Sequence, residues 1–365
     1  MPSKRIQEID PSGIRRVFAL AKTLKNPCNR SIGQPHFDVP EPLKQAAINA
    51  IKQGKNSYTS TEGIDELREA LHASYAKKGA PQEAVFVTSA VSGGFLLALI
   101  ATCDVGDEII IPDPYFVMWK DLPTVFGVRS VTCNTYPDLR WHEEPLRRAI
   151  TDKTRAIVVC SPMNPTGIAM TEEEIKMIAR VAAEHNLWVI YDEIYEAFSY
   201  DHPHYSMSAY YPKTITLGGS SKSLSMTGWR IGSAAGPKDI IEQMIKLQQF
   251  TFICAPSMAQ WAALEGVNYP LDSISADYKR KRDLMVANLK GHYTVVQPEG
   301  AFYLFPEAPR GMSGTEFVHK ALERNLIVIP GNVFSGRDTH FRLSYAQSDA
   351  VLERGIEILI QLANL

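Results

Sequence analysis

Short apolar runs alternate with helical segments through the middle of the chain, and this alternation limits the possible folds more than any other feature. We expect strands at Val85–Val87, Glu108–Ile111, Ala156–Cys160, Leu187–Tyr191, Thr214–Leu217 and Ile231–Ala235. Strands that alternate with helices in this way predict a parallel α/β sheet.

Five positions that suit a ligand lie just past the carboxyl ends of the predicted strands. They are Ala90, Phe116, Asn164, Asp192 and Lys222. In open α/β sheets ligands bind at this edge, so the sequence predicts one site there. Small residues around Ala90 would leave backbone N–H groups free for a phosphate, and an aromatic side chain at Phe116 could stack on a flat ring.

The segment after the run Thr214–Leu217 carries the most specific chemistry. Lys222 follows two serines, and Arg230 comes eight residues later. A lysine amine at the end of a buried strand can form a Schiff base with an aldehyde, and an arginine fork suits a phosphate. Together they match pyridoxal 5′-phosphate (PLP), whose ring acts as an electron sink. On its own, a Ser-Lys pair more often lies in a surface loop whose lysine is solvated.

Composition narrows the class of protein. The chain has 365 residues, enough for two domains, and a net charge of −2, which argues against nucleic acid or an anionic membrane as the main partner. Its five cysteines are scattered, as expected of thiols in a reducing compartment, and no C-x-x-C pair indicates a metal site. No apolar stretch is long enough to span a bilayer and no signal peptide is evident, so we expect a cytoplasmic protein.

The N-terminal region offers two further candidates. Gly33 lies in a Gly/Pro turn and could let a ligand approach the backbone, although an ordinary turn is equally consistent. We expect helices at 41–52, with Pro42 in the first turn, and at 64–75. Tyr58 lies between them in a polar loop, where a tyrosine is usually a surface residue.

The last part of the chain changes to an α+β pattern. We expect short strands at Tyr293–Val296, Ala301–Phe305 and Phe341–Tyr345, and helices near 314–324 and 348–363. Arg342 lies inside the last strand, where either a structural salt bridge or a substrate carboxylate would serve as its partner. The basic run 278–282 reads as a solvated helix face, because no aromatic residues interleave with it.

Taken together, these motifs resemble the fold-type I PLP enzymes and, within them, the class I/II aminotransferases, most closely the bacterial aspartate aminotransferase branch. The likeness runs from Ser31 to Ala346. The motifs that carry it are Ser161-Pro162-Met163-Asn164-Pro165-Thr166-Gly167, Asp192-Glu193-Ile194-Tyr195, Ser221-Lys222 with Thr227-Gly228-Trp229-Arg230, and Gly300-Ala301-Phe302-Tyr303.

The resemblance implies an α/β fold with a mostly parallel seven-stranded sheet between helices. It implies a large PLP-binding domain at 42–270. A small α+β domain would combine 1–41 with 271–365. It also implies a homodimer with shared active sites.

The resemblance further implies a role for each candidate residue. Lys222 would form the internal aldimine and then move the substrate proton. Asp192 would pair with the pyridine nitrogen, and Tyr195 and Asn164 would contact the ring oxygen. Phe116 would stack on the ring. The phosphate would be bound by Ala90, Val91, Ser92, Ser220, Ser221 and Arg230, and by Tyr58 of the neighbouring subunit. Arg342 would bind the substrate α-carboxylate beside Gly33, with Asn164.

Three positions depart from the pattern. Relatives often carry Asn at the position of Met163. They often carry serine at the position of Gly219, so one contact to the phosphate that this serine would make is missing from the pattern. The bacterial aspartate enzymes often carry lysine at Ser92, so no cation for a distal carboxylate can be named.

The function predicted is a ping-pong aminotransferase that passes the amino group of an L-amino acid to a 2-oxoacid, with 2-oxoglutarate as the expected acceptor. Aspartate, aromatic amino acids and alanine all remain open as donors, and Ile14, Arg15 and Arg16 are candidates for selecting the side chain. The alternatives are a C–S β-lyase, a cyclopropane-forming synthase or, of a different class, a PLP-binding regulator without turnover.

Overall fold

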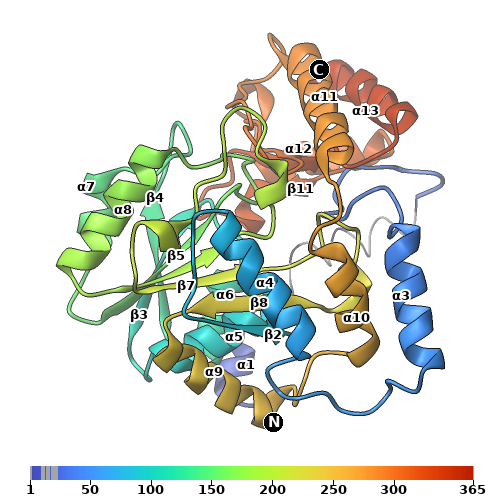
Figure 1. Cartoon of the computed structure of the whole chain (residues 1–365). Coiled ribbons are helices and arrows are strands. Elements are labelled where there is room, and N and C mark those ends of the chain that lie inside the picture. Colours follow the sequence, from blue (N-terminus) through green and yellow to red (C-terminus); the bar gives the residue numbers. More distant parts are fainter. Residues whose placement is uncertain (1, 10–12, 14–16, 18–23, 365) are drawn as a thin grey trace.

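A computed structural model describes residues 2–9, 13, 17 and 24–364. The selectivity candidates Ile14, Arg15 and Arg16 lie outside the described residues. Figure 1 shows a large sheet flanked by helices, with a smaller group of elements built from the C-terminal part of the chain.

A mostly parallel seven-stranded sheet forms the centre of the larger part, as predicted. Its order is β2-β8-β7-β6-β5-β3-β4, and only β8 runs antiparallel to its neighbours. The strands are β2 (Ala84–Thr88), β3 (Glu108–Asp113), β4 (Arg129–Asn134), β5 (Thr154–Cys160), β6 (Trp188–Asp192), β7 (Thr214–Gly218) and β8 (Gly232–Gly236).

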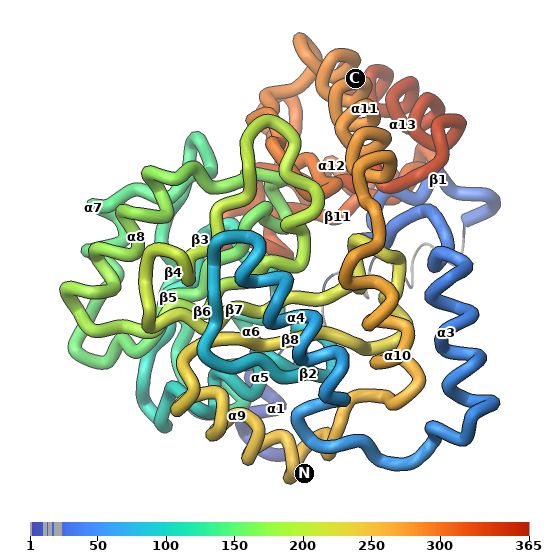
Figure 2. Tube along the Cα trace, in the orientation of Figure 1, coloured from blue at the N-terminus to red at the C-terminus, as the bar shows by residue number. Residues whose placement is uncertain are grey.

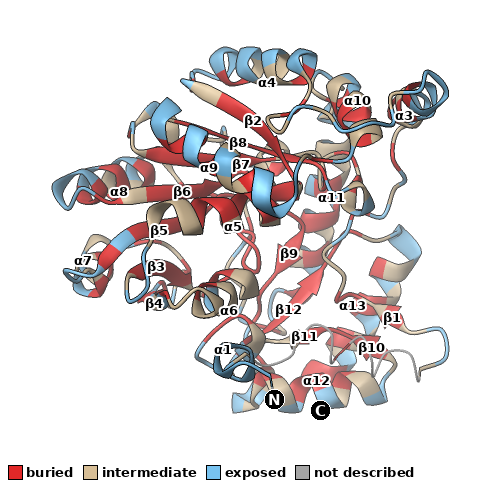
Figure 3. Cartoon of the chain, turned by 90° about the horizontal axis from the view of Figure 1, so that it is seen from below, coloured by how far each residue is buried: buried red, intermediate tan, exposed pale blue. Residues whose placement is uncertain are grey.

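Helices cover both faces of this sheet. They are α3 (Glu41–Lys52), α4 (Asp65–Lys77), α5 (Ala90–Thr102), α6 (Val117–Val125), α7 (Glu143–Ala149), α8 (Glu172–Glu184), α9 (Lys238–Thr251) and α10 (Ser257–Gly266). Because side chains alternate along a strand, β3 buries Ile109 and Ile111 with α5 and α9, and Ile110 with α7 and α8. Figure 3 shows the strands buried and the outer helix faces exposed.

The C-terminal part contains two small sheets. Strand β1 (Cys28–Asn29) pairs with β10 (Leu326–Ile327), and β12 (Phe341–Ser344) lies between β11 (Ile329–Pro330) and β9 (Tyr303–Leu304). Its helices are α11 (Asp272–Leu289), α12 (Gly314–Glu323) and α13 (Asp349–Ala363). Figure 2 shows strand β1 near the C-terminal helix α13, while α1 (Lys4–Gln7) lies near α6, at the opposite side of the molecule from the C-terminus.

One predicted strand is not found. Tyr293 forms an isolated bridge with Lys290 instead of a ladder at Tyr293–Val296, and its ring lies against Phe317 and Phe341. Helix α5 begins at Ala90, five residues before the apolar run that starts at Phe95. The glycines in between are helical because α5 packs closely on β7, where a Cβ at Gly94 would lie 3.0 Å from Leu217.

Among the described residues, no helix combines the length and the apolar character that crossing a membrane requires.

Candidate active site

A pocket of about 330 Å³ opens at the carboxyl ends of the parallel strands, where the sequence predicted a site. All but two of the predicted site residues line it. They are Gly33, Ala90, Val91, Ser92, Phe116, Asn164, Asp192, Tyr195, Ser221, Lys222, Arg230 and Arg342. Segments nearly 310 residues apart in the sequence therefore meet in one place, as the topology requires.

Lys222 follows β7 by four residues, and its amine reaches across the pocket. Its Nζ donates a hydrogen bond to the Gly33 carbonyl at 2.6 Å. Burial, together with the positive charges of Arg342 and Arg230, lowers the pKa of the Lys222 ammonium to about 8, against the opposing effect of Asp192. A substantial fraction of this amine is therefore neutral near physiological pH, which is the form that attacks an aldehyde.

Asp192 ends β6 and is a buried carboxylate without a cationic hydrogen-bond partner among the described residues. The Ile194 N–H donates to its Oδ1 at 3.0 Å. Burial raises the pKa of the Asp192 carboxyl to about 7, although the Ile194 N–H and the charge on Lys222 oppose the rise. A ligand that brings a positive charge to this carboxylate would offset the cost of burying it.

One end of the pocket has the donors that an anion needs. The backbone N–H groups of Ala90, Val91 and Ser92 start helix α5 and have no partners within the helix there. Arg230 Nη2 donates to Ser92 Oγ at 3.0 Å, which places the guanidinium beside them.

Two further observations at this end indicate a built site. Ser221 Oγ is buried and has no hydrogen-bond partner in the part of the chain that the structure describes. Gly232 is required by close packing, since a Cβ there would lie 2.7 Å from the Ala90 carbonyl carbon. A phosphate fits this donor set, and the polar end, the buried carboxylate and the lysine together suit PLP.

The opposite end of the pocket is built around Arg342. Its Nη1 donates to Asn164 Oδ1 at 3.0 Å and its Nη2 to the Ser31 carbonyl at 2.6 Å. The guanidinium lies near two rings, 4.8 Å from the centre of Tyr303 and 4.6 Å from that of Phe334. None of the described acidic side chains pairs with it, so the structural salt bridge considered from the sequence is not found within this part of the chain.

The pocket also contains residues to which sequence reasoning gave no role. They are Met118, Trp119, Cys160, Ile194, Thr227 and Tyr303. Among them, Tyr303 makes a polar contact with a predicted site residue, since its hydroxyl lies 2.8 Å from the Tyr195 hydroxyl. The Gly300–Tyr303 motif was the available signal, yet nothing in a single sequence says which way the ring points.

Two predicted residues lie outside the pocket. Tyr58 is 80% exposed, so within its own subunit it contacts no ligand here. Ser220 lines a second cavity of about 550 Å³ between the sheet, α4 and α10. Its neighbour Ser221 lines the active-site pocket instead. The phosphate contact expected from Ser220 stays a prediction.

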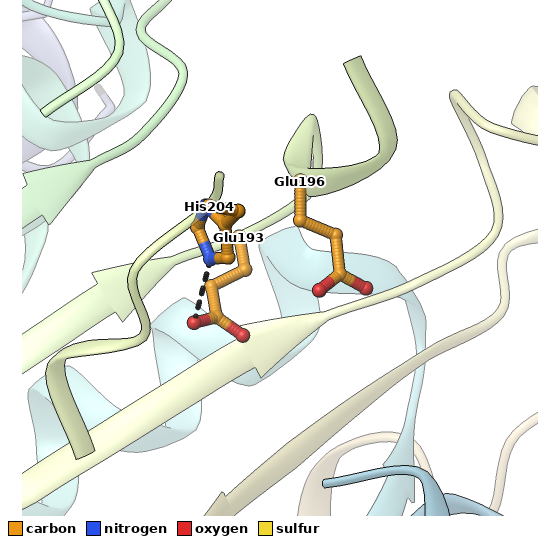
Figure 4. A group of neighbouring side chains, drawn as sticks. All are labelled: Glu193, Glu196 and His204. Carbon is orange, nitrogen blue, oxygen red and sulfur yellow. Dashed lines mark hydrogen bonds and ion pairs between the residues drawn. The ribbon is translucent and has the colours of Figure 1, made fainter. Parts of the chain in front are cut away.

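Figure 4 shows three acidic and basic side chains that line this second cavity, Glu193, Glu196 and His204. Their ligand atoms lie within 4.8 Å of one another, a spacing that a metal ion could use. Each carboxylate already has a cationic partner in this chain, since His204 Nε2 lies 3.0 Å from Glu193 and Lys78 lies 2.6 Å from Glu196. Although burial opposes it, the hydrogen bond and charge of Glu193 raise the pKa of His204.

Comparisons with known proteins agree with this geometry. The family model described as aminotransferase class I and II matches residues 26–359. A probable aspartate aminotransferase of Methanocaldococcus jannaschii is 34% identical over 372 residues, which cover 98% of this chain and 99% of that protein.

Two solved structures have the same fold over nearly the whole chain. The aspartate aminotransferase of Thermus thermophilus with maleate is 33% identical, with a TM-score of 0.94 and 99% of each chain covered. The aromatic aminotransferase of Pyrococcus horikoshii is also 33% identical, with a TM-score of 0.89, and covers 95% of this chain and 98% of its own.

The lowered pKa of Lys222 predicts that this amine becomes reactive at lower pH than an ordinary lysine, whose pKa is about 10.4. Below pH 8 the ammonium form is protected, and above it the neutral amine reacts. Brief competitive labelling of the protein without cofactor by acetic anhydride, read by mass spectrometry of the Lys222 peptide, should give a midpoint near pH 8. Removing a positive charge in Arg342→Gln should raise this midpoint. A wild-type midpoint near that of the exposed lysines would contradict the pocket's electrostatics.

Proposed function

Because this chain belongs to the class I and II aminotransferases, which are PLP-dependent enzymes, we propose that the pocket described above is its active site and that each residue there has the role set out below. The enzyme transfers the amino group of an amino acid. The single observation that carries the site assignment is that Lys222, Asp192 and the anion-binding end share one pocket.

PLP, when bound, supplies an electron sink for the bonds at the substrate α-carbon. Lys222 would hold the cofactor aldehyde and, once released by the substrate, would take the proton from the substrate α-carbon and deliver it to the C4′ carbon of the cofactor. Asp192 keeps the pyridine nitrogen protonated by its charge. Ala90, Val91, Ser92, Ser221 and Arg230 hold the phosphate.

The remaining residues orient the two ligands. Tyr195 and Asn164 contact the ring oxygen, and Phe116 covers the ring face. Arg342 binds the substrate α-carboxylate, supported by its buried Nε, which has no hydrogen-bond partner among the described residues, and by the Tyr303 and Phe334 rings beside its guanidinium. The first substrate leaves as a 2-oxoacid, and a second 2-oxoacid, for which we propose 2-oxoglutarate, takes up the amino group.

The division into a large domain at 42–270 and a small domain at 1–41 and 271–365 is also part of the proposal. Its support is that the small sheets share no strand with the seven-stranded sheet. A cytoplasmic location is consistent with five free thiols.

A panel of amino acids with PLP and 2-oxoglutarate tests the activity. We expect glutamate to form with one or a few donors, because the pocket holds both the lysine and the carboxylate-binding arginine. Lys222→Ala should lose the visible absorbance of the bound cofactor and nearly all turnover. An absorbing wild-type protein that forms no glutamate but releases ammonia would favour the lyase reading, and a Lys222→Ala variant that keeps both properties would refute the site.

Asp192→Ala should still bind PLP, because the phosphate contacts remain, but kcat should fall on the order of 10²-fold or more. The physical reason is that a neutral pyridine nitrogen withdraws electrons poorly. Asp192→Glu, which keeps the charge, is the matched control and should retain more activity than the alanine variant. A kcat for Asp192→Ala within twofold of the wild-type value would reject the role.

We also propose that the enzyme is a homodimer. An exposed apolar group lies at the end of α9: Phe250, in its last turn, is 82% exposed, and Ile253, just after the helix, is 46% exposed. The loop of Tyr58 lies against the same region, because Gln248 Nε2 donates to the Thr61 carbonyl at 2.5 Å and Gln260 Nε2 to Thr59 Oγ1 at 2.9 Å. An exposed apolar group of this kind is typical of an interface.

Sedimentation equilibrium should therefore give a mass of twice 40.6 kDa. Phe250→Asp should shift the protein toward the monomer and weaken PLP binding, since Tyr58 of the partner subunit would no longer reach the phosphate. Val105→Asp, at a side chain that is 83% exposed elsewhere on the surface, is the control and should change neither property. A wild-type monomer at micromolar concentration would contradict the proposal.

A further inference from the structure

Tyr303 contacts both ends of the active-site pocket, although no role has been assigned to it. It begins strand β9, is fully buried, and pairs with Ser344 of β12. Its hydroxyl lies 2.8 Å from the Tyr195 hydroxyl, and the two rings meet edge to face with their centres 5.7 Å apart. The residue is therefore fixed against Tyr195 by its ring as well as by its hydrogen bond.

The ring of Tyr303 also supports the substrate-binding end. The Arg342 guanidinium lies over this ring, 4.8 Å from its centre, and 4.6 Å from the centre of the Phe334 ring. Such contacts restrict the plane of an arginine side chain.

The position of the Tyr303 hydroxyl is set by Gly33 as well. A Cβ on Gly33 would lie 2.5 Å from the hydroxyl oxygen, so any larger residue there would displace the ring. The same Gly33 accepts the hydrogen bond of Lys222. Tyr303 thus contacts Tyr195, Arg342 and Gly33 at once.

The direction of the hydroxyl–hydroxyl bond matters for the chemistry. A tyrosine hydroxyl has one proton to donate and two lone pairs. If Tyr195 donated to Tyr303, it would have no proton for a ligand in the pocket. If Tyr303 donates instead, the Tyr195 proton is free to point into the pocket, and a hydroxyl that accepts one hydrogen bond donates a stronger one.

We propose that Tyr303 is a positioning residue that links the two ends of the site: its hydroxyl donates to Tyr195 and so commits the Tyr195 proton to the cofactor ring oxygen, while its ring holds the Arg342 guanidinium in the plane that a substrate carboxylate needs. This inference rests on the proposed function, because it assumes that Tyr195 contacts the cofactor.

The pH dependence of the visible absorbance of the bound cofactor tests the hydroxyl. A donor to the ring oxygen stabilises its ionised form, so a weaker donor should raise the pH midpoint of the spectrum. Tyr303→Phe should raise it by roughly half a unit to one unit, the size expected for one hydrogen bond, and Tyr195→Phe should raise it further. The other titratable groups beside these hydroxyls, Cys160, Asp192, Lys222 and Arg342, are unchanged in both variants.

The double variant separates a positioning role from a general structural effect. If Tyr303 acts through Tyr195, then Tyr195→Phe combined with Tyr303→Phe should have the midpoint of Tyr195→Phe alone. Tyr293→Phe is the control: it removes a buried hydroxyl that donates to the Leu359 carbonyl at 2.7 Å outside the pocket, and it should leave the midpoint unchanged. An unchanged midpoint in Tyr303→Phe, or additive shifts in the double variant, would overturn the hydroxyl's role.

The ring is tested by a KM comparison. Tyr303→Phe keeps the ring and should leave the KM for the amino-acid substrate within about twofold, whereas Tyr303→Leu removes it and should raise KM several-fold more than kcat falls. Equal KM values in the two variants would overturn this part. A wild-type protein that shows no cofactor absorbance would instead refute the proposed site, which distinguishes failure of the function from failure of the inference.

Discussion

The site depends on placing ionisable groups of both signs in one buried pocket without letting them neutralise each other. Asp192 and Lys222 face the same space, yet each is held by the backbone, the first by the Ile194 N–H and the second by the Gly33 carbonyl. Because both groups are buried, desolvation moves both pKa values toward neutrality, to about 7 for Asp192 and about 8 for Lys222. A protein that leaves such charges without a direct ion pair gives up stability, and a ligand that meets both of them recovers it on binding.

The parallel sheet explains why these groups meet, and the N-terminal segment explains how the pocket is closed. Strands β5, β6 and β7 run in the same direction, so Asn164, Asp192 and Lys222 emerge at one edge. Arg342 comes from a different sheet, and the segment after β1 joins the two: the Ser31 carbonyl accepts from Arg342 and the Gly33 carbonyl from Lys222. Arg30, buried in the same segment, donates to the Ser344 carbonyl at 2.6 Å and so fixes the strand that carries Arg342.

Much of the fold and site could be predicted because local signals and topology agree. The central strands were apolar runs, their order of appearance indicated a parallel sheet, and the residues at their ends converge on one pocket. The edge strand β4 was not predicted because it contains few buried residues: of its six positions, only Cys133 is buried. The strand expected at Tyr293–Val296 is not formed: Tyr293 makes an isolated bridge with Lys290 instead of a ladder, and its ring packs against Phe317 and Phe341.

Side-chain direction was the other limit of the sequence. Ser220 and Ser221 are chemically identical neighbours, and only the turn after β7 decides that Ser221 faces the pocket while Ser220 faces the second cavity. Tyr303 was visible in a motif but acquired meaning only through its 2.8 Å contact with Tyr195. A contact between two residues that are 108 positions apart depends on how the two sheets lie against each other. The periodicity of the sequence does not predict that arrangement.

A second set of charged side chains lies next to Asp192, in the other cavity. Glu193 follows Asp192, and its side chain points into the cavity on the other side, where His204 pairs with it. An unpaired charge at Glu193 would raise the pKa of the neighbouring Asp192 carboxyl further, because like charges disfavour ionisation. His204 is the partner of Glu193, since its Nε2 lies 3.0 Å from that carboxylate, and the Glu193 charge still contributes to the raised pKa of the Asp192 carboxyl.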